Sequence, residues 1–141
     1  MKTGFEIQTD IYKLLSNNPL LMEGIGGKVY RQGLRPRDSQ KEDLVVIFTT
    51  ADAEQMQSGV VTLNLFVPYI SIGANGVMYE NIARCEELEI LLQSVCDGMA
   101  VSTDYRFTLK DAIHTQRDDE LKQSFVVARL SFRILNKSKN N

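Results

Sequence analysis

The sequence predicts an α+β fold, a two-layer sandwich with two helices packed on one face of a mainly antiparallel sheet of about four to five strands. Apolar residues recur at helical steps of three and four near the start of the chain and between residues 78 and 98. Apolar and polar residues alternate, as in half-buried strands, in the middle and at the end. The 141 residues match one domain, residues 1–141, with 136–141 expected to form a disordered tail.

The first segment predicts a helix that ends by Asn18, because the residue before Pro19 disfavours helical geometry. Its apolar side chains at helical spacing are Phe5, Ile11, Leu14 and Leu15. Asn18 and Pro19 then suit the N-cap and first position of a short helical turn that Gly24 stops. Residues 28–31 form a short extended piece, and the polar residues 32–43 predict an exposed loop, of a length that often carries function.

Two strands are expected after this loop. Residues 44–50 form a continuous apolar and β-branched run, typical of a strand covered on both faces or central in a sheet. The stretch VVTLNLFVP alternates and ends at Pro68, which cannot donate to a sheet ladder. Gly73 and the Asn75-Gly76 pair mark a connection to the clearest helix, over residues 78–98. Its apolar stripe holds Ile82, Cys85, Leu88, Leu92, Val95 and Met99. Residues 105–109 and 126–134 then predict a long hairpin, with the polar residues 114–120 as its loop.

The composition is that of an ordinary soluble globular protein, with 43% apolar and 24% charged residues. A net charge of -2 gives no electrostatic reason for tight nucleic-acid binding. The amino terminus lacks the pattern of a secretion signal and no apolar run could span a membrane, so we expect folding in a cytoplasm. Cys85 and Cys96 would lie roughly 16 Å apart along one helix, beyond the reach of a disulfide. Both are expected to be buried as small hydrophobic residues.

The stretch GIGGKVYR, residues 24–31, raises the question of a phosphate-binding loop. A Walker-type loop needs GxxxxGK followed by Ser or Thr, between a strand and a helix. Here Lys28 is followed by Val29, a helix precedes and a strand follows, which favours a structural turn. A small ligand-binding or enzymatic domain with a pocket near Gly24–Lys28 remains the alternative function.

No combination of residues assembles a nucleophile, a base and an oxyanion site, so the sequence predicts neither an enzyme nor a bound cofactor or metal. The single histidine, His114, is expected at an exposed hairpin tip. The acidic groups at 86–89 and 118–120 are expected to be solvated. A loop with charges of both signs suits a polar protein contact. The candidate contact residues are Arg31, Arg35, Arg37, Asp38 and Glu42 in the first loop, and His114, Arg117 and Asp118 in the second.

The order of elements resembles the tail-completion, or tail-terminator, proteins of long-tailed bacteriophages and prophages. The resemblance covers residues 5–135. It rests on an amphipathic first helix, then NPLL, GGKVY, the loop RPRDS, the strand DLVVIF, the later QSGVVTLNLFVP, a long helix and a closing hairpin. Relatives carry a Pro and an aromatic residue before the apolar strand, where this chain has Glu42 and Asp43.

The resemblance implies an architectural role in virion assembly. Such proteins form a homo-oligomeric ring, commonly a hexamer, on the end of the tail tube. The ring ends tube polymerisation and joins the tail to a neck or head-closure protein. DNA passes through its channel without specific binding, and a slightly acidic chain is compatible with that. The implied location is the bacterial host cytoplasm during assembly, and then the tail or neck of the virion.

Overall fold

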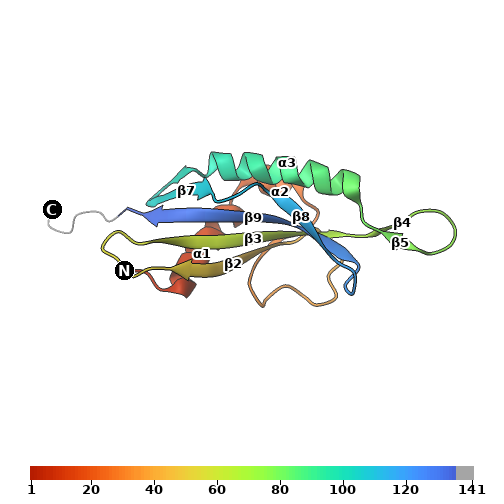
Figure 1. Cartoon of the computed structure of the whole chain (residues 1–141), viewed down its shortest axis with the longest axis horizontal. Coiled ribbons are helices and arrows are strands. Elements are labelled where there is room, and N and C mark those ends of the chain that lie inside the picture. The colour runs from red at the N-terminus through yellow and green to blue at the C-terminus, as the bar shows by residue number, and fades with distance from the viewer. Residues whose placement is uncertain (136–141) are drawn as a thin grey trace.

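The computed structural model describes residues 1–135, and the expected tail at 136–141 lies outside them. Three helices and nine strands follow in the order α1 (Gly4–Ser16), α2 (Pro19–Gly24), β1 (Val29–Arg31), β2 (Leu44–Ala51), β3 (Ser58–Pro68), β4 (Ile70–Ser71), β5 (Met78–Tyr79), α3 (Ile82–Gly98), β6 (Val101–Ser102), β7 (Tyr105–Leu109), β8 (His114–Asp118) and β9 (Gln123–Ile134). The expected α+β class is confirmed, with the helices behind and above one large twisted sheet (Figure 1).

The main sheet has seven strands, more than the predicted four to five. Its order is β1-β2-β3-β9-β7-β6, and all pairs are antiparallel except the parallel pair of β1 and β2. The long strand β9 pairs with β3 from Gln123 to Arg133. On its other side it pairs first with β8 and then with β7. The prediction missed β6 and β8 because neither has an apolar alternation of its own.

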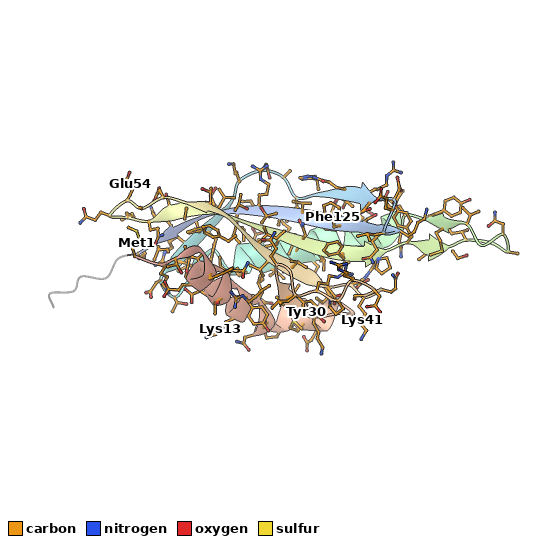
Figure 2. All side chains as sticks on the ribbon, turned by 90° about the horizontal axis from the view of Figure 1, so that it is seen from below. Met1, Lys13, Tyr30, Lys41, Glu54 and Phe125 are labelled. Atoms are coloured by element: carbon orange, nitrogen blue, oxygen red, sulfur yellow. The ribbon has the colours of Figure 1, made fainter. Side chains whose placement is uncertain are left out.

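The hydrophobic core lies between the helices and one face of the sheet. Ile7, Ile11 and Leu15 of α1 are fully buried, and Leu88 and Leu92 of α3 join the same cluster. The sheet contributes its inward-facing positions, among them Leu44, Val46, Val61, Leu63, Leu65, Val126, Ala128 and Leu130. Figure 2 shows α1 against one side of the sheet, with the opposite side not covered by a helix. We call this opposite side the open face.

Local caps set the starts of the helices, and the cap of α2 is the one that the sequence predicts. The Asn18 side chain accepts a hydrogen bond from the Leu21 N–H, and Pro19 occupies the first turn of α2. Thr3 and Glu6 form a reciprocal capping box at the start of α1. Phe5, predicted on the buried stripe of this helix, is instead 75% exposed.

The second expected helix begins at Ile82 rather than at residue 78, because Asn81 caps it and residues 78–79 form β5. Ile82 is exposed, unlike the rest of the predicted apolar stripe. Cys85 and Cys96 are buried free thiols, as predicted. Burial raises the pKa of both, that of Cys96 to about 12.

Candidate assembly surfaces

The glycine turn at residues 24–28 holds two carboxylates of the same chain. The Gly26 N–H donates to Glu42 Oε1 at 3.0 Å, and the Lys28 N–H donates to Asp43 Oδ1 at 2.9 Å. A Cβ on Gly27 would lie 2.2 Å from Asp43 Oδ1, so only glycine allows this approach. Asp43 and Glu42 therefore occupy the N–H groups that a phosphate loop would offer to a ligand.

Arg84 fixes Glu42 from the other side. Its Nε and Nη2 donate to the two Glu42 carboxylate oxygens, each at 2.8 Å, and Nη2 also donates to the Gly24 carbonyl. This bidentate pair joins α3 to the end of the 32–43 loop. Hydrogen bonding by Arg84 holds the pKa of Glu42 below its usual value. Glu42, a predicted partner contact, is thus engaged within its own chain.

Arg35 is also engaged within the chain. Its Nε donates to Asp43 Oδ2 at 2.9 Å, and its Nη2 donates to Gln123 Oε1 at 2.9 Å and to the Lys41 carbonyl at 3.1 Å. The guanidinium lies 4.1 Å from the centre of the Phe66 ring. Only 11% of the Arg35 side chain is exposed. Arg35 therefore clamps the 32–43 loop onto the sheet.

The remaining predicted contact residues of the first loop differ in their exposure and in their contacts within the chain. Arg31 donates to Gln8 Oε1 at 2.8 Å and lies over the Phe5 ring, so it links β1 to α1. Arg37 and Asp38 are exposed on the outer part of the loop. Arg37 makes no hydrogen bond or ion pair with another of residues 1–135. A contact role for these three residues stays a prediction.

The expected hairpin loop at 114–120 is wrong, because residues 114–118 form strand β8 and the turn comes at 119–122. Strand β8 could not be predicted from its polar side chains, because backbone hydrogen bonds to β9 hold it in place. His114 is exposed and lies beside Gln116. Asp118 Oδ1 accepts the Leu121 N–H and shapes the turn, whereas Arg117 is exposed. The structure thus places these residues on strand β8, whose end at Asp118 pairs with Gln123, the hydrogen-bond partner of Arg35.

A groove of about 480 Å³ lies on the open face beneath the 32–43 loop. Its floor is formed by outward-facing side chains of β2 and β3, and Leu121 of the β8–β9 turn closes one side. Phe66 packs against Phe125 at 5.7 Å between ring centres, which extends the apolar floor onto β9. The lining residues are Gly33, Arg35, Pro36, Arg37, Val45, Ile47, Asn64, Phe66 and Leu121.

A hairpin projects from the end of the molecule beyond the main sheet (Figure 1). We call residues 69–79 the arm; its strands β4 and β5 pair through only two residue pairs. Its exposed large apolar side chains are Ile70, Ile72, Val77, Met78 and Tyr79. The sequence predicts only a connection around Gly73 and Asn75-Gly76, followed by a helix from residue 78. A signal was present, because no charged residue occurs between Glu54 and Glu80.

The base of the arm is firmly anchored. The Tyr69 hydroxyl donates to Asp119 Oδ1 at 2.6 Å, which raises the pKa of this tyrosine to about 12, and the Tyr69 N–H donates to the Lys122 carbonyl. On the returning strand, Glu80 Oε2 accepts the Ser124 hydroxyl at 2.7 Å. These bonds to the β8–β9 turn and the start of β9 fix the direction in which the arm leaves the body.

Comparisons with protein-family models, with curated proteins and with solved structures find no match. Within residues 1–135, no group of three His, Cys, Asp or Glu side chains is placed to hold a metal ion. No helix among these residues is long and apolar enough to cross a membrane. The glycine turn, the clamped loop, the groove and the arm are thus the features on which a function can be argued.

Proposed function

We propose that this chain is a structural protein of virion assembly that forms a homo-oligomeric ring on the end of a phage or prophage tail tube. The ring ends tube polymerisation and joins the tail to a neck or head-closure protein, while DNA passes through it. The observation that carries the proposal is the uncharged arm, which exposes five large apolar side chains away from the body. Such a surface on an isolated domain is typical of a protein interaction site.

Ring formation needs two different patches that meet under a closing rotation. The chain offers an apolar projection and an apolar groove on separate parts of its surface. The resemblance of the chain to tail-terminator proteins supplies the biological setting. Assembly would take place in the host cytoplasm, and the finished ring would belong to the tail or neck.

The test is the mass of the purified chain in solution, measured by light scattering after size exclusion over a wide concentration range. We expect a concentration-dependent shift to one closed species, commonly of six copies, visible as rings in negative-stain images. The same measurement after co-expression with the tail tube protein of the same genome tests capping. A monomer in both measurements would contradict the proposal.

Substitution at the 32–43 loop provides a matched pair for this assay. Arg37→Glu reverses an exposed charge without touching the clamp, so the monomer should stay folded while loop-mediated association weakens. Arg35→Glu would place a carboxylate beside Asp43 and damage the fold itself. Intact assembly in Arg37→Glu would count against Arg37 as a contact without affecting the arm.

A further inference from the structure

Four of the five exposed apolar side chains of the arm lie toward one of its faces, and Met78 lies on the other. Ile70 pairs directly with Tyr79, so their side chains point to the same side. Side chains two residues apart in a strand share a face. Ile72 and Val77 follow beyond the two pairs, each two residues from Ile70 or Tyr79, which is the spacing that puts strand side chains on one side. This apolar face holds Ile70, Ile72, Val77 and Tyr79, which are between 38% and 57% exposed.

The arm has little to hold it in water by itself. Two residue pairs of backbone bonding are fewer than an isolated hairpin needs, since even longer two-stranded hairpins are marginal. Gly73 and Gly76, both at positive φ, lie in the loop at its tip. The anchored base orients the arm, but the side chains of its apolar face remain 38–57% exposed. A surface that packs against this face would therefore complete the arm.

The groove on the open face has the character that such a partner surface needs. Val45, Ile47 and Phe66 give it an apolar floor. Its volume of about 480 Å³ gives room for apolar side chains such as those of the arm's apolar face. Arg35 holds the loop wall and the Phe66 ring in place, so the groove is formed before any partner arrives.

We infer that the apolar face of the arm of one copy packs into the open-face groove of a neighbouring copy. This inference rests on the self-assembly in the proposed function and names the contact that would produce it. The arm projects along the long axis away from its own body, so a neighbour is the copy it can reach (Figure 1).

The number of contacts per subunit favours a second copy of this chain over a one-to-one partner. The four side chains expose roughly 300 Å² together, from their exposed fractions and about 150–200 Å² per large side chain. One arm-in-groove contact then buries about 600 Å² over both sides, which is below the ~1,200 Å² of the smallest stable specific interfaces. In a closed ring each subunit both inserts an arm and receives one. Two such contacts therefore hold each subunit, whereas only one would hold a one-to-one partner.

The test uses two single variants, Ile72→Cys on the arm and Leu121→Cys at the groove, purified separately and mixed under mild oxidation. A disulfide between the two proteins is expected at least tenfold above the control mixture of Ile90→Cys with Leu121→Cys. Ile90 is 66% exposed on α3, remote from the arm's apolar face, and the native thiols are buried. The disulfide between the two proteins should form only when Ile72→Cys and Leu121→Cys are mixed, and not with either variant alone.

A second measurement uses Ile72→Asp with Val77→Asp in one chain. Because neither side chain belongs to the core, the far-UV circular dichroism and Tm should match the parent, while the oligomer falls to monomer. Ile90→Asp is the matched control and should still assemble. Rings without the cross-link, or rings from the arm variant, would overturn the inference and leave the ring function standing. A cross-link in open chains would uphold the contact and contradict the ring. A monomer without a cross-link would overturn both.

Discussion

Removing the Arg35 side chain should destabilise the protein, although Arg35 lies in a surface loop. Arg35→Ala deletes the ion pair with Asp43, the bond to Gln123 and the contact with Phe66. Asp43 is 1% exposed, and breaking a buried ion pair from one side costs about 3–5 kcal/mol. Asp43 keeps its bonds from the Ser39 hydroxyl and the Lys28 N–H, so we expect about 2–3 kcal/mol.

The assay is urea unfolding followed by far-UV circular dichroism. With a slope of about 1.5–2 kcal/mol/M for a chain of this size, the midpoint should fall by about 1–2 M urea. Arg37→Ala, two residues away and exposed, is the control and should change stability by less than about 0.5 kcal/mol. A double-mutant cycle with Asp43→Asn should give a coupling of at least about 1 kcal/mol. Equal midpoints for Arg35→Ala and Arg37→Ala would refute the clamp.

Three further predictions concern the glycine turn and the core. The pKa of Asp43 is lowered because hydrogen bonds from Ser39, the Lys28 N–H and Arg35 outweigh the opposing effect of burial. Because this pKa is lower in the folded than in the unfolded state, ionised Asp43 stabilises the folded protein above the ordinary pKa of about 3.9. This contribution is lost as the pH falls through the folded-state pKa, so the free energy of unfolding should decrease below about pH 4. Asp43→Asn should flatten that drop when urea unfolding is repeated from pH 7 to pH 3. Gly27→Ala should lower the free energy of unfolding by about 2–3 kcal/mol in the same assay, because its Cβ would clash with Asp43 and the Glu42 backbone. The control is Gly33→Ala, whose Cβ meets no atom within 4 Å, so that only the strain of its positive φ destabilises it. Cys85 and Cys96 should react with a thiol reagent at pH 8 at least about 100-fold more slowly in the folded protein than in urea, and fast reaction of either would contradict its burial.

Several elements could be predicted because their causes are local. The Asn18-Pro19 pair caps and starts α2 through bonds within four residues. The alternation from Val61 to Val67 states which side chains of β3 are buried. The helical spacing of Leu88, Leu92 and Val95 likewise identifies the core face of α3. In each case neighbouring residues decide the outcome, so the pattern is readable along the chain.

The candidate surfaces were predictable only in part. The 32–43 loop was predicted to be functional from its length and charge. Charge alone does not distinguish a residue that contacts a partner protein from one that, like Arg35, holds the loop within its own chain. Arg35 and Asp43 are eight residues apart, and Gln123 joins them only because the sheet brings β9 beside the loop. The arm was missed because its apolar residues are few and interrupted by glycines, so the alternation is too short to register.

The sequence by itself determined the α+β class, the two main helices, the buried cysteines and the structural nature of the glycine turn. The tertiary structure decided the partners of that turn, since Glu42 and Asp43 reach it across about 16 residues of chain. It also decided that β8 is a strand, because backbone pairing with β9 forms it and the polar side chains of β8 do not predict a strand. The projection of the arm and the depth of the groove depend on how strands distant in sequence pair, which no local pattern encodes.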